Sequence, residues 1–250
     1  MRRIVVATNR VCTSRIRRSR LAGLPACGKL AAVIARVSIR HAYLHGFRSD
    51  ANSVKGTWLA ERYLARGKTL ERLDLNRPSF RELTLSGALA ALDEAHAAGP
   101  ASARWRLVGS SMGGYVAALW SASHPERVDR AVLLCPAFGF ARRWEALIGA
   151  AGMQAWQQTG WRTFVGPGER ESPVHWALVE DMRRHPEQPA IACPTVIVHG
   201  RRDTVVPLSV SRGYAETNPS VELTEVDDDH AMVDSLETIG DITASFLLEG

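Results

Sequence analysis

The sequence predicts an α/β protein in which a mostly parallel sheet is covered by helices on both faces. From residue 38 onward, short apolar runs typical of strands alternate with segments of helical periodicity. This order favours parallel strands joined by crossover helices. One apolar run also ends at a glycine-flanked serine, after which a helical pattern begins at once. We therefore expect one domain over residues 38–250, preceded by a basic, poorly ordered extension at residues 1–37.

The individual elements follow from apolar runs and from the signals that end them. The predicted strands cover residues 39–44, 69–75, 105–108, 131–134, 195–198 and 221–226. The predicted helices cover residues 53–66, 84–98, 112–123, 208–217 and 235–248. Gly67, Gly99-Pro100 and His124-Pro125 follow the first three helices and are typical termination signals. The sequence thus predicts a sheet of about six strands.

The glycine-flanked serine is the first candidate for chemistry. Gly109-Ser110-Ser111-Met112-Gly113 fits the Gly-x-Ser-x-Gly pattern, in which a sharp turn exposes the central hydroxyl above a sheet. The five residues alone are also compatible with a plain glycine-rich turn between core elements. However, Leu107 and Val108 precede the turn and an apolar helical face follows it. This strand-to-helix setting favours Ser111 as a nucleophile.

Two later strand ends carry the groups that a nucleophilic serine needs. Asp203 follows the predicted strand 195–198, and His230 follows the predicted strand 221–226. Taken singly, Asp203 fits a helix N-cap and His230 fits a surface histidine. Together with Ser111 they have the order serine, acid, histidine, which is that of the α/β-hydrolase topology. Asp227 to Asp229 are rival acids, but their closeness in sequence makes bridging to the His230 ring awkward.

The loop after the first strand predicts an oxyanion site. It reads His45-Gly46-Phe47, and a tight turn there lets the backbone N–H of Phe47 face the same oxyanion as the N–H of Met112. We expect His45 to be a buried residue that holds this loop in place. In the predicted reaction, Ser111 attacks a carbonyl carbon, His230 takes and returns its proton, and Asp203 orients the imidazole. This chemistry requires no metal and no cofactor.

The motifs resemble those of the α/β-hydrolase superfamily, and within it the YqiA/YcfP-like bacterial esterases and the ABHD10-type (thio)esterases. The resemblance is carried by Tyr43 to Phe47, Asp74 to Phe80, Leu107 to Trp120, His199 to Asp203 and Asp229-His230. It implies an α/β-hydrolase fold with Ser111, Asp203 and His230 as the triad and the Phe47 and Met112 amides as the oxyanion hole. The full superfamily sheet has two further strands before the His-Gly loop. Only residues 3–8 are strand-like there, so we expect a shortened sheet.

Residues 138–193 are expected to form a helical lid insertion. No clear strand pattern is visible in this stretch, which contains Trp144, Trp156, Trp161, Phe164 and Trp176. The aromatic residues fit a small core that holds the insertion together. They also fit the wall of a substrate pocket, for which Trp144, Trp156 and Trp161 are the candidates. An apolar cap over Ser111 would favour an acyl chain or an aromatic group on the substrate.

Charge and cysteine content limit the partners and the compartment. The net charge is +5, but residues 1–40 contain ten Arg or Lys and no acid, and the remaining residues carry 21 bases against 26 acids. A nucleic-acid partner would thus depend on the first forty residues only, and we predict none. The four cysteines lack metal-site spacing and suggest a reducing compartment. We predict a cytoplasmic protein, or a mitochondrial one if residues 1–37 are a transit peptide.

These observations predict a serine hydrolase acting on a small-molecule acyl ester or thioester. An acyltransferase or a cofactor-free peroxidase on the same scaffold, and a non-catalytic ligand-binding member, are the alternatives. Serine at position 111 argues against the aspartate-based chemistry of dehalogenases and epoxide hydrolases. No apolar run of membrane-spanning length is present in the sequence. The oligomeric state is left open.

Overall fold

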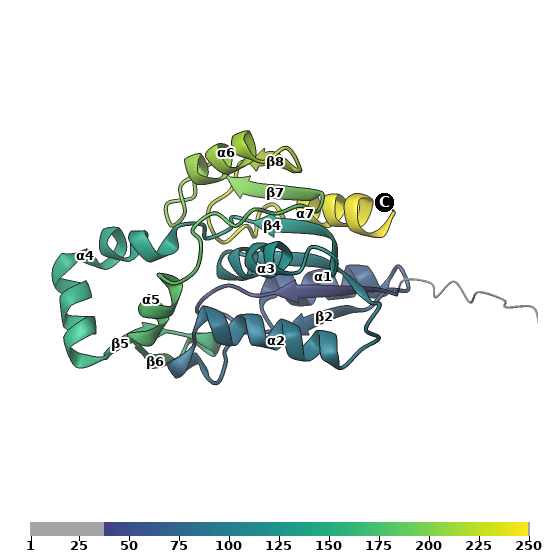
Figure 1. The fold of residues 1–250 in the computed structure, drawn as a ribbon. Coiled ribbons are helices and arrows are strands. Elements are labelled where there is room, and N and C mark those ends of the chain that lie inside the picture. The colour runs from purple at the N-terminus through teal and green to yellow at the C-terminus, as the bar shows by residue number, and fades with distance from the viewer. Residues whose placement is uncertain (1–37, 250) are drawn as a thin grey trace, which may run out of the picture. The chain divides into compact units, whose positions relative to one another are not determined.

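The main sheet of the computed structural model, which describes residues 38–249, has six strands. Their order is β2-β1-β3-β4-β7-β8, and every neighbouring pair is parallel (Figure 1). The strands are β1 (Ile39–Leu44), β2 (Leu70–Leu73), β3 (Arg104–Ser110), β4 (Val128–Leu134), β7 (Thr195–Gly200) and β8 (Val221–Val226). The six-strand parallel sheet is therefore confirmed. The expectations for residues 1–37 concern positions outside the described residues.

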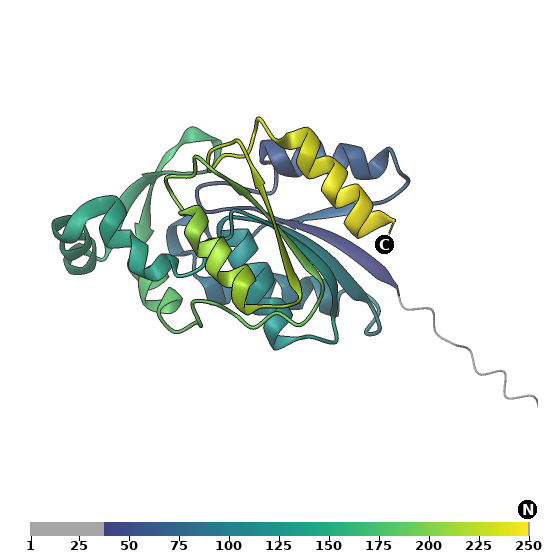
Figure 2. The same ribbon diagram turned by 90° about the horizontal axis from the view of Figure 1, so that it is seen from above.

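Helices cover both faces of this sheet, as predicted. They are α1 (Val54–Leu64), α2 (Leu85–Ala97), α3 (Met112–Ser123), α6 (Leu208–Thr217) and α7 (Leu236–Thr243), with short helical turns η1 (Phe80–Glu82) and η3 (Ala244–Leu248). Figures 1 and 2 show α1 and α7 on one side of the sheet and α2, α3 and α6 on the other. The sheet is thus the middle layer of three.

The division of the core into two clusters follows from the alternation of side chains along each strand. In β3, Leu107 packs in the cluster under α2, α3 and α6, whereas Val108 packs in the cluster under α1 and α7. In β4, Leu133 and Val132 divide in the same way. The central strands β3, β4 and β7 are buried on both faces over much of their length and contain continuous apolar runs, whereas the edge strands β2 and β8 also carry charged residues.

The insertion between β4 and β7 differs from the predicted helical lid. It contains α4 (Phe140–Thr159), a two-stranded antiparallel hairpin of β5 (Trp161–Val165) and β6 (Glu171–His175) with η2 (Pro167–Glu169) in its turn, and α5 (Ala177–Met182). The expectation of helices without strands is therefore wrong. Charged residues at 162 and 171 and Pro173 interrupt the apolar alternation of the two short strands, so the hairpin pattern was weak.

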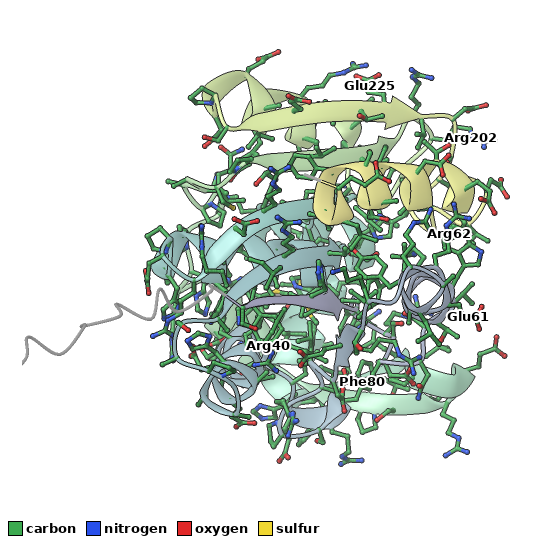
Figure 3. All side chains as sticks on the ribbon, turned by 90° about the vertical axis from the view of Figure 1, so that its right-hand side faces the viewer. Arg40, Glu61, Arg62, Phe80, Arg202 and Glu225 are labelled. Atoms are coloured by element: carbon green, nitrogen blue, oxygen red, sulfur yellow. The ribbon has the colours of Figure 1, made fainter. Side chains whose placement is uncertain are left out.

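Charged side chains tie α1 to α7 at the surface. Arg62 of α1 forms ion pairs with Glu237 and Asp241 of α7, at 2.7 and 3.1 Å. Its guanidinium also lies over the Trp58 ring, 4.6 Å from the ring centre. Figure 3 shows Arg62 at this junction, seen from the side on which α7 lies in front. Both acids are largely exposed, so each ion pair contributes at most about 1 kcal/mol.

The carboxyl ends of four strands bring the predicted site residues to one edge of the sheet. β1 ends just before His45, β3 just before Ser111, β7 three residues before Asp203, and β8 four residues before His230. In a parallel sheet these ends lie side by side, and the loops that follow them form the usual ligand-binding edge. The sheet alone therefore brings residues from four distant segments to one place.

Candidate active site

Ser111 occupies a strained turn between β3 and α3. Its backbone has φ 53° and ψ −115°, a conformation that residues other than glycine rarely adopt. A Cβ atom on Gly113 would clash with the backbone oxygens of Leu44 and His45, so the turn fits only when this position is glycine. Gly113 is thus required by the close approach of α3 to the end of β1.

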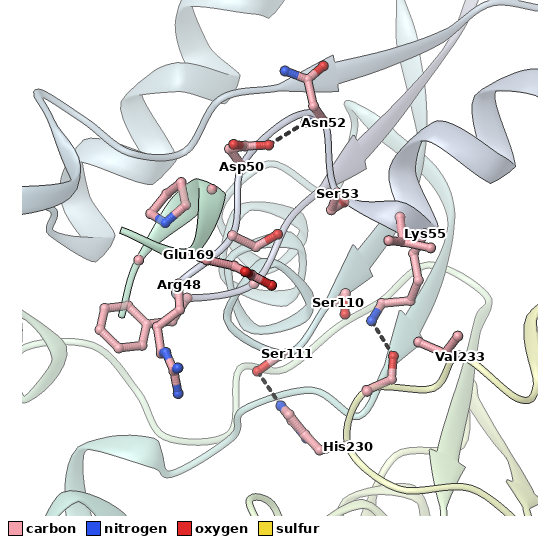
Figure 4. Close-up of a pocket in the computed structure, with 18 of the residues that line it drawn as sticks. Arg48, Asp50, Asn52, Ser53, Lys55, Ser110, Ser111, Glu169, His230 and Val233 are labelled. Atoms are coloured by element: carbon pink, nitrogen blue, oxygen red, sulfur yellow. Dashed lines mark hydrogen bonds between the residues drawn. The ribbon is translucent and has the colours of Figure 1, made fainter. Parts of the chain in front are cut away.

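Ser111, His230 and Asp203 form a continuous hydrogen-bonded chain. The Oγ of Ser111 lies 2.9 Å from Nε2 of His230, and Nδ1 of His230 lies 2.7 Å from Oδ2 of Asp203 (Figure 4 shows the first contact). The acid is buried, whereas the His230 side chain is 23% exposed. These distances allow proton transfer between serine and imidazole, with the carboxylate orienting the ring.

The surroundings of Asp203 stabilise its charged form. Oδ1 accepts hydrogen bonds from the backbone N–H groups of Val205 and Val206, both at 2.8 Å. Burial by itself raises the pKa of Asp203, but hydrogen bonds from His199 and His230 and the charge of His230 outweigh it and hold the pKa well below its usual range. The carboxylate is therefore ionised at neutral pH.

His199 is a residue that the sequence analysis did not assign to the site. Its Nε2 lies 2.9 Å from the backbone oxygen of Val206 and 3.3 Å from Oδ2 of Asp203, and its Nδ1 lies 2.7 Å from Oγ of Ser211. Two acceptors face Nε2, so this nitrogen carries the proton and the Ser211 hydroxyl donates to Nδ1. His199 thus donates to the same carboxylate as His230. The sequence shows only that it follows an apolar strand.

The three acids before His230 have other partners. Asp227 pairs with Arg202 at the surface. Asp228 is buried and accepts hydrogen bonds from the backbone N–H groups of Asp229 and Ser235. Asp229 accepts from the N–H of Ala231. These bonds shape the loop that carries His230, whereas Asp203 is the acid that reaches its ring.

The His-Gly loop lies directly beside the serine. A Cβ atom on Gly46 would lie 3.3 Å from Cβ and 3.9 Å from Oγ of Ser111. His45 is fully buried, with Nδ1 2.9 Å from the oxygen of Gly46 and Nε2 accepting from the N–H of Leu75 at 2.9 Å. It joins this loop to the end of β2, as expected for a residue that holds the loop in place.

Two backbone N–H groups remain candidates for an oxyanion site. Met112 is the first residue of α3, whose first turn no side chain caps, and N–H groups at this position have no partner within the helix. Phe47 follows Gly46, and its ring packs 5.6 Å from Trp144 and 5.3 Å from Phe164 of the insertion. The insertion thus braces the loop that carries the Phe47 amide.

Lys55 contacts the His230 loop from α1. Its Nζ donates to the backbone oxygen of Ala231, at 2.5 Å (Figure 4). Burial lowers the pKa of Lys55, while Cys135, Asp228 and Asp229 oppose that shift. No local sequence pattern indicates this contact, because it joins residues 176 positions apart.

Two cavities meet at Ser111 and His230. The first, about 610 Å³, is lined by both polar and apolar residues and is drawn in Figure 4. Its polar side chains include Arg48, Asp50, Asn52, Ser53, Lys55 and Glu169. The second, about 850 Å³, lies under the insertion, and we call it the aromatic cavity. Its apolar lining is Phe47, Phe140, Trp144, Leu147, Ile148 and Phe164. An ester bound at Ser111 would thus have different surroundings on its two sides.

The three tryptophans proposed for a pocket have different positions. Trp144 is buried and lines the aromatic cavity. Trp156 is buried behind it, with its ring 5.2 Å from that of Trp144 and its N–H donating to the oxygen of Val174. Trp161 is 39% exposed and packs against His175 and Arg81. Neither Trp156 nor Trp161 lines a described cavity, so the structure does not place them in a pocket.

One described cluster has side chains that are suitable for a metal ion. Ligand atoms of Cys135, His199 and Asp203 lie within 4.8 Å of one another, and all three residues are buried. The ring nitrogens of His199 and both oxygens of Asp203 already have hydrogen-bond partners. Burial raises the pKa of the Cys135 thiol, so it is neutral at physiological pH. These residues are therefore better described as the surroundings of Asp203, the acid of the hydrogen-bonded chain.

Comparison with known proteins gives a family and a fold. Residues 40–247 match the model of a family described as "Uncharacterised protein family (UPF0227)". A search of the curated proteins finds no match. Mouse alpha/beta hydrolase domain-containing protein 10 is 19% identical, with a TM-score of 0.69 over 84% of this chain and 89% of that chain. Est1E from Butyrivibrio proteoclasticus is 18% identical, with a TM-score of 0.67 over 85% and 88%.

A third structure, from Agrobacterium vitis S4, is 26% identical, with a TM-score of 0.72 over 83% of this chain and 87% of that chain. These similarities extend over most of each chain. They confirm the predicted α/β-hydrolase fold.

Proposed function

The chain belongs to the UPF0227 family and has the α/β-hydrolase fold, and from this premise we propose that it is a serine hydrolase that cleaves carboxylic esters or thioesters. The observation that carries the proposal is the hydrogen-bonded chain from Ser111 through His230 to Asp203. Ser111, at one end of this chain, has a strained backbone and is flanked by glycines, and the two cavities meet at its side chain. Nucleophile, base and orienting acid are thus within reach of one another and of a substrate.

The proposed reaction proceeds through an acyl-enzyme. Ser111 Oγ attacks the carbonyl carbon, and its proton passes to Nε2 of His230. The N–H groups of Met112 and Phe47 would stabilise the oxyanion that develops. When the bond to the leaving oxygen or sulfur breaks, His230 returns the proton to the leaving group. Water, activated by the same imidazole, then attacks the acyl-enzyme and releases the acid, which restores Ser111.

The test is covalent labelling combined with turnover. The wild-type protein should react with a fluorophosphonate probe and hydrolyse p-nitrophenyl esters or acyl thioesters from a series of rising chain length. Ser111→Ala should abolish both reactions and leave the unfolding temperature within a few degrees, since the hydroxyl is not a core contact. Ser110→Ala is the matched control, because the neighbouring hydroxyl has no role in the proposed chemistry. Labelling that persists in Ser111→Ala would place the nucleophile elsewhere.

The location of the protein remains a prediction. No helix within residues 38–249 is both long and apolar enough to cross a lipid bilayer. The choice between the cytoplasm and the mitochondrion depends on residues 1–37, which lie outside the described part of the chain. Fractionation of cells that express the full chain, beside a chain without residues 1–37, would distinguish the two locations.

A further inference from the structure

The aromatic cavity is lined by a cation, Arg162, that forms no ion pair within the described residues. Arg162 is on β5 and lines this cavity together with Phe164, two residues further along the same strand. Both side chains are half-buried, whereas Trp161, Thr163 and Val165 between and beside them are exposed. The alternation of the strand therefore directs Arg162 inward. Its guanidinium lies 5.8 Å from the centre of the Phe164 ring.

No acid neutralises Arg162 within residues 38–249. None of the ion pairs found there includes this side chain, although most arginines of the sheet and its helices have a carboxylate partner. The guanidinium instead lies against α4, where a Cβ atom on Gly152 would be 3.2 Å from one of its terminal nitrogens. A charged group in this position is partly removed from water and still has free donors.

A second guanidinium lines both of the cavities that meet at the serine. Arg48, in the loop that carries the Phe47 amide, lines both cavities, and its Nε donates to the backbone oxygen of Val165 at 2.6 Å. That bond holds the guanidinium between the loop and the hairpin. Glu169 is the one acid among the described residues of the aromatic cavity, and it is exposed in the hairpin turn. The cavity therefore has excess positive charge beside apolar walls.

We propose that the substrate is an ester or thioester with an apolar or aromatic group that ends in a carboxylate, and that Arg162 binds this carboxylate in the aromatic cavity. The inference rests on the proposed function, since it places the reacting carbonyl at Ser111. Planar guanidinium groups bind carboxylates through two parallel hydrogen bonds, and the aromatic walls accept the apolar part of the same group. Arg48, which lines both cavities, adds to the positive potential of the aromatic cavity.

The test compares substrates that differ only in the carboxylate. The acyl arm uses the mono-p-nitrophenyl ester of adipic acid and p-nitrophenyl hexanoate, whose acyl chains are equally long. The leaving-group arm uses the hexanoate esters of 4-hydroxybenzoate and of phenol. We expect kcat/KM to be about 10- to 100-fold higher for the carboxylate in one arm. The arm that shows the preference identifies the side of the ester that enters the aromatic cavity.

Arg162→Gln should remove this preference, so that kcat/KM for the carboxylate ester and for its neutral counterpart differ by less than about twofold. Arg170→Gln is the matched control, since Arg170 belongs to the same hairpin and its loss changes the net charge equally, but it lines neither cavity. It should keep the preference. Arg162→Lys retains the positive charge but lacks the planar guanidinium that forms two parallel hydrogen bonds. It should therefore keep part of the preference for the carboxylate. The unfolding temperature of each variant shows whether the hairpin is intact.

Three outcomes separate the inference from the proposed function. If neutral esters are cleaved in a Ser111-dependent way but neither arm prefers the carboxylate, the inference is wrong and the hydrolase stands. Equal losses in Arg162→Gln and Arg170→Gln would also overturn it, because they would show a general effect of charge. If no ester is cleaved and the fluorophosphonate does not react, the proposed function itself fails.

Discussion

Asp203 is the residue on which the orientation of His230 depends. Asp203→Asn keeps the size of the side chain but removes the charge that fixes the imidazole tautomer. We therefore expect kcat to fall by roughly 10⁴, as for the acid of other serine triads. The matched control is Asp227→Asn, whose carboxylate is largely exposed and pairs with Arg202. Steady-state kinetics should show little change in the control, and a normal kcat for Asp203→Asn would disprove the assignment of the acid.

His199 is the second donor to the same carboxylate, and its effect should be smaller. Loss of a hydrogen bond to a buried charge costs about 1.5–3 kcal/mol, so His199→Leu should lower kcat by about 10- to 100-fold. His199→Gln can donate from its amide and should recover part of the rate. Both variants should be assayed for kcat and for the free energy of unfolding. If both variants lower the free energy of unfolding equally but keep kcat, His199 stabilises the fold and does not orient Asp203.

The insertion is an element held together by its aromatic side chains. Trp156 has ring contacts with Trp144, Phe164 and Trp176 and is 1% exposed. Trp156→Ala should lower the free energy of unfolding by about 3–5 kcal/mol, because it leaves a large cavity and an unpaired oxygen on Val174.

Trp161→Ala is the control for this change. Its ring is at the surface of the same insertion, so the loss should be below about 1 kcal/mol. Urea unfolding of both variants measures the difference. Similar losses would mean that the surface of the insertion contributes as much to stability as its core.

The sequence predicts the main sheet and its helices more completely than it predicts the insertion. The predicted helix at residues 53–66 is α1, and Ser53 caps it by accepting from the N–H of Gly56. Local signals of this kind locate the strands of the main sheet, and the central strands also have apolar runs that are buried on both faces. The hairpin was missed because its alternation is short and interrupted. Contacts such as Lys55 with Ala231 or Arg48 with Val165 join residues more than a hundred positions apart, and no local pattern encodes them.

Across the whole molecule, acid stability should depend in part on His41 in the central region of the sheet. His41 is 6% exposed, and its ring packs edge-on to Tyr63, with centres 5.4 Å apart. Burial, with the charges of Arg106 and Lys68, lowers the pKa of His41 from 6.5 to about 4, although Asp129 opposes the shift. Its Nδ1 has no hydrogen-bond partner within the described residues.

The sign of the pH effect follows from this shift. Between pH 6.5 and about 4 the unfolded chain binds a proton at His41 and the folded chain does not. The contribution of His41 is therefore fully present above pH 6.5 and is lost as the pH falls toward 4, by on the order of 2 kcal/mol. His41→Leu should flatten the fall of unfolding free energy across this window while other carboxylates and histidines titrate as before. Urea denaturation at several pH values measures the difference, and parallel curves for the two proteins would show that His41 is protonated in the folded state.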